Sequence, residues 1–337
     1  MIILAVESSC DETAVALVKD GREVLADCIA SSVEMHKIYG GVVPELASRK
    51  HIEVISNLAD EALAKAGITR KEIDAVAVTY APGLIGAVLV GVNFAKSVAF
   101  SLGVPLIPVH HVRGHIAANY LTHPDLEPPF VCLCVSGGTS LIVDVKSYTE
   151  MEILGATRDD AAGECFDKIA RVMGLGYPGG GPLDRASQSG DDKAFTLPRV
   201  HIHDAPLDMS FSGLKTAMLN LIHNAQQKGE DLPVSDLAAS FSAAVSDELV
   251  PRTMFAARQK GYGKVAVVGG VAANSRIRRD LEAACQKDGC KLYMPPLKLC
   301  GDNGSMIGSQ GYYEYLAGVR AGTDLNAFAN RDISLQY

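Results

Sequence analysis

The sequence contains the same strand–loop–strand pattern twice. In residues 2–18 two apolar runs flank a polar loop at 7–12, and in residues 130–145 two apolar runs flank a loop at 136–140. Short apolar runs on either side of a polar loop predict β-hairpins. Two related hairpins, each opening one half of the chain, indicate an internal duplication, although single hairpins of this kind are common in α/β proteins.

Around the two hairpins, segments with helical spacing alternate with short apolar strands. Such alternation predicts an α/β fold in which helices cover mixed sheets. The glycine-rich stretch 174–184 predicts a loop. The predicted helices are 43–66, 86–102, 110–121, 161–174, 212–225, 235–260, 275–288 and 305–318, and the predicted strands between them are 73–79, 104–109 and 264–268.

The composition is that of a compact protein. The chain has 337 residues, 48% hydrophobic and 21% charged, which excludes disordered and collagen-like classes and is long enough for two lobes. Its formal net charge of −8 does not attract polyanions. A nucleic-acid partner would therefore need a local basic patch, such as Arg276, Arg278 and Arg279 or Arg49 with Lys50, or a helper subunit.

The most membrane-like stretch is residues 83–109. Lys96 divides it, and Pro105 and Pro108 break its second part. A span needs about 20 apolar residues, so we expect a buried helix followed by a strand. The first twelve residues are acidic rather than basic, unlike a signal peptide, and the eight cysteines form no CxxC pair. We expect a cytoplasmic protein without membrane contact.

A histidine cluster is the first candidate for chemistry. His111 and His115 are four residues apart, so on a helix they share one face and can bind one metal. Zinc peptidases of the H-E-x-x-H type carry a glutamate base after the first histidine, but here Val112 occupies that position, which argues against a metallopeptidase. Asp302 is the candidate third ligand. The alternatives are solvated histidines and an aspartate that caps a helix.

Glycine-rich turns are the second candidate. No G-x-x-x-x-G-K-[ST] or G-x-G-x-x-G motif occurs, but Ser136–Thr139 and Gly269–Asn274 each follow a strand. Backbone amides exposed by glycine suit contacts with phosphate. Asp167 and Asp184 could accept hydrogen bonds from sugar hydroxyls, or they could be ordinary surface acids.

Taken together, a series of ordered motifs resembles the TsaD family of tRNA threonylcarbamoyltransferases, once described as glycoproteases. The resemblance covers essentially the whole chain, and the small departures are Ser8 and Thr139, where the family often has other residues. The motifs are residues 7–13, 40–49, 82–84, 96–116, 135–139, 166–168, 210–215, 269–274 and 302–303.

The family resemblance implies a fold and a reaction. The fold is a duplicated actin/Hsp70/sugar-kinase-like (ASKHA) α/β fold, with two lobes and a cleft between them. We expect a first lobe of residues 1–115 plus 300–337 and a second lobe of residues 116–299. The implied reaction moves the threonylcarbamoyl group from threonylcarbamoyl-AMP to the N6 amine of adenosine 37 in tRNAs that read ANN codons, and AMP is released.

The resemblance also implies site residues. His111, His115 and Asp302 bind one divalent metal, iron by family resemblance, with zinc or magnesium as alternatives. Asp11 and Glu12 lie beside the reacting group, and we infer that one of them is a catalytic base. The residues implied to bind the adenylate are Cys134, Val135, Ser136, Gly137, Gly138, Asp167, Gly180, Asp184 and Asn274.

Partners follow from the same resemblance. They are tRNA, an inactive paralogue of the same fold, which could dock on helix 43–66, and a small ATPase subunit. The alternative function that remains is an ATP-dependent kinase or ATPase of the same fold. Such an enzyme would not need the His111/His115 pair.

Overall fold

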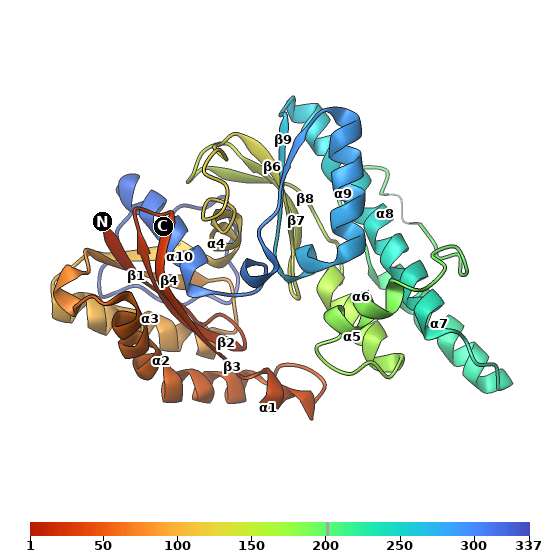
Figure 1. Ribbon diagram of the computed structural model, residues 1–337, viewed down its shortest axis with the longest axis horizontal. Helices are drawn as coiled ribbons and strands as arrows, with labels where there is room; N and C mark the ends of the chain where they lie inside the picture. Colours follow the sequence, from red (N-terminus) through yellow and green to blue (C-terminus); the bar gives the residue numbers. More distant parts are fainter. Residues whose placement is uncertain (200–201) are drawn as a thin grey trace. The chain divides into compact units, whose positions relative to one another are not determined.

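Each half of the chain forms one five-stranded sheet with helices packed on it (Figure 1). The computed structural model describes residues 1–199 and 202–337. It divides into two units, whereas the sequence prediction placed the boundaries at residues 115 and 300. Unit 1 is Met1–Pro128, Lys146–Glu152 and Pro295–Tyr337, and unit 2 is Pro129–Val145 and Ile153–Met294.

The sheet of unit 1 has the order β3-β2-β1-β4-β5. The first three strands are antiparallel neighbours, whereas β1, β4 and β5 run parallel. The bounds are β1 (Ile2–Glu7), β2 (Glu12–Lys19), β3 (Glu23–Ser31), β4 (Ala75–Ala81) and β5 (Leu106–His110).

Alternate residues of β1 face opposite sides of this sheet, as the period of a strand requires. Leu4 and Val6 belong to one core cluster, with α2 and α3, and Ile3 and Ala5 belong to another, with α10. The helical elements of unit 1 are α1 (Val33–Lys37), α2 (Pro44–Ala66), η1 (Arg70–Glu72), α3 (Ile85–Leu102), α4 (His111–Ala117), η3 (Leu297–Leu299) and α10 (Gly304–Leu316).

Small residues let α10 lie close to the sheet. A Cβ atom on Gly308 would lie 2.5 Å from the Val18 side chain, and one on Gly311 would lie 2.6 Å from Ala77. On α4, a Cβ atom on Gly114 would lie 2.6 Å from Ile307 of α10. These close contacts hold α4 against α10 beside the sheet.

Unit 2 has the sheet order β10-β9-β6-β7-β8, which is the order of unit 1 with the corresponding strands renumbered. The hairpin β6–β7 is antiparallel, and β6, β9 and β10 are parallel. The repeated order supports the predicted duplication. The bounds are β6 (Phe130–Val135), β7 (Ser140–Val145), β8 (Met151–Ala156), α5 (Ala162–Val172), α6 (Gly180–Ser187), α7 (Ser212–Lys228), α8 (Val234–Lys260), β9 (Lys264–Val268), η2 (Gly270–Ala273), α9 (Ser275–Asp288) and β10 (Lys291–Tyr293).

Both predicted hairpins and each predicted helix and strand are confirmed, with shifted ends; α4 is the most shortened. The sequence prediction missed β3, β8 and β10 and the short helix α1. It was wrong for residues 180–184, which begin α6 rather than continue a loop. Proline at the third helical position, Pro182, has no intrahelical N–H bond to lose, because the first turn of a helix leaves those groups unpaired.

Within the described ranges, α3 is the one helix long and apolar enough to cross a membrane. One of its faces is in the core, where Val88 and Val92 pack beside β4, and the other exposes Leu89 and Phe100. The helix that we predicted in this stretch is therefore buried on one face only.

Candidate metal centre

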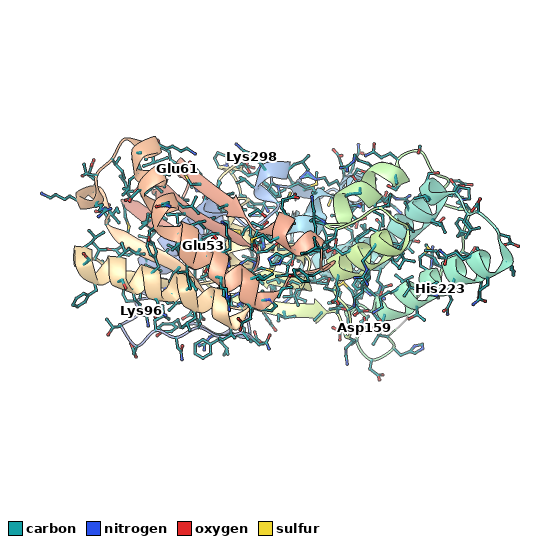
Figure 2. The ribbon with its side chains drawn as sticks, turned by 90° about the horizontal axis from the view of Figure 1, so that it is seen from below. Glu53, Glu61, Lys96, Asp159, His223 and Lys298 are labelled. Atoms are coloured by element: carbon teal, nitrogen blue, oxygen red, sulfur yellow. The ribbon has the colours of Figure 1, made fainter. Side chains whose placement is uncertain are left out.

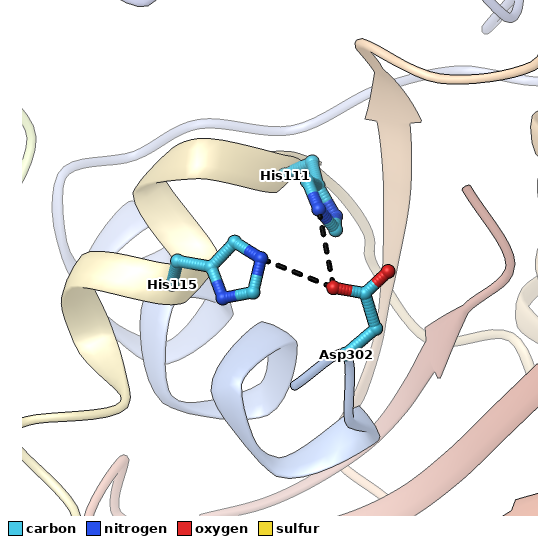
Figure 3. Close-up of side chains that lie close together, drawn as sticks. All are labelled: His111, His115 and Asp302. Carbon is cyan, nitrogen blue, oxygen red and sulfur yellow. Dashed lines mark ion pairs between the residues drawn. The ribbon is translucent and has the colours of Figure 1, made fainter. Parts of the chain in front are cut away.

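Three potential ligands meet in unit 1, as the sequence predicted (Figure 3). His111 and His115 lie one turn apart on α4, and Asp302 precedes α10. One ligand atom from each residue lies within 4.8 Å of the others. The packing of α4 on α10 therefore brings together residues that are far apart in the sequence.

The geometry fits a metal better than a hydrogen-bonded cluster. Asp302 Oδ1 lies 3.1 Å from His115 Nε2 and 3.5 Å from His111 Nε2. His115 Nε2 is buried, and it makes no hydrogen bond within the described part of the chain. The helix-cap alternative for Asp302 is wrong, because Asn303 caps α10 by accepting from Met306 N at 2.8 Å. The two histidines and one carboxylate are thus free to share a divalent cation.

Glu7 is a functional residue that the sequence reasoning missed. It ends β1 and is fully buried. Its carboxylate lies 3.1 Å from His111 Nδ1 and also accepts hydrogen bonds from Ser9 N and the Thr79 hydroxyl. With Nδ1–H donated to Glu7, His111 presents its unprotonated Nε2 to a metal. The signal in the sequence is an acid at the end of an apolar strand.

Buried charges set the protonation of the metal-free centre. Burial opposes the charged form of Asp302, but His111 and His115 outweigh it and lower the pKa of Asp302 to about 2. Burial likewise opposes the charged form of His111, but Glu7 and Asp302 raise its pKa to about 9. Metal binding at neutral pH would therefore release a proton from His111.

Glu7→Gln is expected to weaken metal binding 10- to 100-fold, roughly the effect of losing a carboxylate behind a ligating histidine. The amide can donate to His111 Nδ1 and so favours the tautomer with the proton on Nε2, which cannot ligate. Calorimetric titration of metal-free protein measures the change. Glu53→Gln, which removes an exposed charge on the outer side of α2 (Figure 2), is the control. An unchanged metal affinity in Glu7→Gln would show that His111 does not depend on Glu7.

The stability of the metal-free protein is expected to fall as the pH rises through the His111 titration. The pKa of about 9 in the folded protein lies above the ordinary histidine value of 6.5, so the stabilisation is complete below pH 6.5 and is lost by about pH 9. The loss is on the order of 3 kcal/mol. Urea unfolding in the presence of a chelator measures it, with His111→Gln as the comparison. Equal slopes for the two proteins in this window would contradict the assignment.

Asp11 lies on the β1–β2 loop and Glu12 is the first residue of β2, in the same unit as the metal ligands. Glu12 accepts a hydrogen bond from Ser31 Oγ at 2.9 Å. Burial, followed by the charges of Asp11 and Asp302, raises the pKa of Glu12 to about 9. In the metal-free protein Glu12 is therefore protonated at neutral pH.

The two glycine-rich turns meet in unit 2. Gly269 has a φ of 93°, and a Cβ atom there would lie 2.3 Å from Val135 O, so only glycine fits where the turn after β9 meets the end of β6. Gly163 N, at the start of α5, donates to Ser136 O at 3.2 Å. A Cβ atom on Gly137 or Gly138 would have no neighbour within 4 Å in the described chain. The turn therefore has room for a ligand against its backbone.

Three polar residues predicted to bind the adenylate accept hydrogen bonds from backbone N–H groups. Asp167 Oδ1 accepts from Gly179 N at 2.7 Å, next to Gly180. Asp184 Oδ1 accepts from Ser275 N at 2.9 Å, and Asn274 Oδ1 accepts from Ile277 N at the start of α9. Asp184 and Asn274 thus meet at the start of α9, whereas Asp167 contacts the residue before α6.

The two candidate basic patches are compensated by acids. Arg276 pairs with Asp192 and Asp280. On α2, Arg49 lies 3.6 Å from Glu45 and Lys50 lies 3.2 Å from Glu53. Arg276 is thus a poor candidate for a strong phosphate contact, whereas the pairs of Arg49 and Lys50 are exposed and weak.

Comparison with known families agrees with this geometry. The profile of the TsaD family, described as tRNA N6-adenosine threonylcarbamoyltransferase, matches residues 23–309. The chain belongs to the TsaD family. The resemblance inferred from the motifs is therefore confirmed.

Similar proteins of the same description come from clostridia. A tRNA N6-adenosine threonylcarbamoyltransferase of Clostridium botulinum (strain 657 / Type Ba4) is 54% identical over 97% of this chain and 96% of its own. One from Clostridium perfringens (strain ATCC 13124) is 51% identical over 98% and 97%.

Solved structures with low identity share the fold. The crystal structure of HypF from T. kodakarensis has a TM-score of 0.66 at 17% identity, covering 96% of this chain and 49% of that one. Component A of (R)-2-hydroxyglutaryl-CoA dehydratase from Acidaminococcus fermentans has a TM-score of 0.54 at 15% identity, covering 94% and 99%. The predicted ASKHA-type α/β fold class is confirmed.

Proposed function

We propose that this chain transfers the threonylcarbamoyl group from threonylcarbamoyl-AMP to the N6 amine of adenosine 37 in tRNAs that read ANN codons, with release of AMP. The observation that carries the proposal is the His111, His115 and Asp302 cluster, in a chain that belongs to the TsaD family. No feature of residues 1–199 and 202–337 favours a kinase. Val112 is buried on α4 and supplies no peptidase base.

The donor requires recognition of an adenylate, and we assign it to unit 2. The open glycine turn, Gly137 and Gly138, suits the phosphate because backbone N–H groups bind anions without lysine. We assign the remaining adenylate contacts to Cys134, Val135, Ser136, Asp167, Gly180, Asp184 and Asn274.

The ligand set bears on the choice of metal. Two imidazoles and one carboxylate suit iron or zinc, whereas magnesium prefers oxygen ligands. We therefore propose iron, with zinc as the alternative, held by His111, His115 and Asp302. When bound, the metal would supply a Lewis acid that stabilises negative charge developing on the carbonyl or phosphate oxygens.

The chain's own residues move the proton. The N6 amine attacks the carbamoyl carbon, the bond from that carbon to the phosphate oxygen breaks, and AMP leaves. The amine must lose one proton as its new C–N bond forms. We assign Asp11 as the base, because the Glu12 carboxylate accepts a hydrogen bond from Ser31 Oγ at 2.9 Å and burial, followed by the charge of Asp11, raises the pKa of Glu12.

We propose that tRNA binding depends on partner subunits. The net charge of −8 repels a polyanion, and the candidate basic patches are paired with acids. The partners are an inactive paralogue of the same fold and a small ATPase. Ile38, Tyr39 and Ile52, on and before α2, are exposed and apolar, which supports paralogue docking there. We place the reaction in the cytoplasm, since no disulfide joins any of the eight cysteines in the described chain.

Transfer to unmodified tRNA is the test. With threonylcarbamoyl-AMP, metal and both partners, we expect repeated turnover; with the chain alone, we expect weak, salt-sensitive tRNA binding and little turnover. Mass analysis of tRNA nucleosides measures the product, and a tRNA without adenosine at position 37 is the control. Absence of product with all components would contradict the function. Sustained turnover by the chain alone at moderate salt would contradict only the dependence on partners.

A further inference from the structure

Three successive backbone carbonyls of the β1–β2 loop are each held by a different element. Ser9 O accepts from Leu84 N, at the start of α3, at 2.8 Å. Cys10 O lies 3.0 Å from His51 Nε2 of α2. Asp11 O accepts from Ser32 N at 2.9 Å and from Ser32 Oγ at 2.7 Å, just before α1. The loop that carries Asp11 is thus anchored from outside the sheet.

His51 can make its contacts in only one neutral tautomer. A carbonyl oxygen has no proton to give, so Nε2 must carry the proton that is donated to Cys10 O. Nδ1 then accepts from the Thr13 hydroxyl, 2.6 Å away. His51 is fully buried, and burial, as the largest cause, lowers its pKa, which keeps it neutral.

His36 reaches the same loop through Ser32. Its Nδ1 accepts from Val43 N at 3.3 Å, so the proton is on Nε2, which faces Ser32 Oγ at 3.0 Å. Ser32 Oγ donates in turn to Asp11 O. His36 is fully buried and Ser32 is 2% exposed, so water does not compete for these bonds.

These contacts determine how Asp11 is oriented. The Cys10–Asp11 peptide is held through the Cys10 carbonyl, and the Asp11–Glu12 peptide is held through the Asp11 carbonyl. A peptide unit is planar, so fixing both planes that flank a residue fixes its φ and ψ and the direction of its side chain. In a trans peptide the Asp11 N–H points away from the Cys10 carbonyl. It therefore points away from His51, which holds this peptide through the carbonyl alone.

We propose that His36 and His51 are positioning residues, which hold Asp11 in its catalytic orientation by anchoring the peptides on either side of it. Neither histidine touches the predicted metal ligands. The proposal rests on the proposed function, because that function assigns Asp11 as the base.

The experiment compares two variants of His51, each of which keeps a different one of its two hydrogen bonds, to Cys10 O and to the Thr13 hydroxyl. In His51→Gln the side-chain amide nitrogen takes the place of Nε2 and can still donate to Cys10 O, whereas His51→Asn is too short to do so and can keep only the contact to Thr13. Steady-state transfer, which gives kcat and KM for tRNA, is measured with both partners, together with metal affinity and thermal unfolding.

We expect kcat of His51→Asn to fall about 10- to 100-fold, as for a misplaced catalytic group, while KM for tRNA and the metal Kd stay unchanged. His51→Gln should restore most of kcat. A role in packing alone would not separate the two variants in this way. If both variants match the wild type, or if only KM changes, the proposal is overturned. Inactive wild-type protein would instead overturn the proposed function.

Ser32→Ala keeps the inference testable if His51→Asn is unfolded at the assay temperature. This substitution takes away only a hydroxyl: it removes the link between His36 and Asp11 O and leaves the bond from Ser32 N. A fall in kcat with unchanged metal affinity supports the proposal, and an unchanged kcat overturns the role assigned to His36.

Discussion

His111→Ala and His115→Ala are each expected to abolish stoichiometric metal binding and threonylcarbamoyl transfer, and to leave the fold near that of the wild type. Each variant leaves two ligands, one histidine and Asp302. Two are too few, because a catalytic metal site uses three protein ligands. If the bound metal stabilises the transition state by about 4 kcal/mol, transfer slows about 10³-fold. Metal analysis after dialysis, circular dichroism and the nucleoside assay measure the three properties.

His110→Ala is the matched control from the same cluster. His110 caps α4: its Nδ1 accepts from Val112 N at 3.2 Å, and its Nε2 lies 3.1 Å from Arg331 O. Its loss should cost about 1 kcal/mol of stability, typical of a helix cap, and should leave the metal in place. Equal loss of metal from all three histidine variants would contradict a site built on His111 and His115.

The histidine pair could be predicted because its geometry is local. Two residues four apart on one helix share a face, whatever the rest of the fold is. The spacing alone therefore indicates that both histidines can bind the same metal ion. Asp302 could be predicted only as a candidate, since its position depends on how α10 packs. Glu7 is visible in the sequence as an acid that ends an apolar strand, but its contact with His111 could not be predicted, because it joins residues 104 positions apart.

The same distinction applies to the fold. The strands β1 and β6 are nearly continuous apolar runs that are buried on both faces, and such runs are visible in a sequence. β3 and β8 mix exposed and buried residues, and β10 has three residues, so their pattern is weak. The anchoring of Asp11 by His36 and His51 also needed the structure, since it depends on which carbonyl each ring faces.

Arg113→Met is expected to destabilise the protein by about 3–5 kcal/mol, the cost of leaving one member of a buried ion pair alone. Arg113 lies on α4 between the two histidines and is 2% exposed. Its Nη1 donates to Glu314 Oε1 at 2.8 Å, and its Nε and Nη2 donate to Ile333 O. Methionine fills a similar volume but leaves the carboxylate and the carbonyl without these donors. Urea unfolding with metal present measures the loss.

A double variant and an exposed pair separate the buried charge from other effects. Arg113→Met combined with Glu314→Met removes both charges, so it should recover much of the stability lost in the single variant. Arg70→Met breaks the exposed pair with Asp60, which has a similar distance of 2.6 Å, and should change stability little, because water screens that pair. If Arg113→Met were as mild as Arg70→Met, the pair with Glu314 would not be what fixes α4 against α10. The orientation of the metal-binding helix would then have to come from the glycine contacts between the two helices alone.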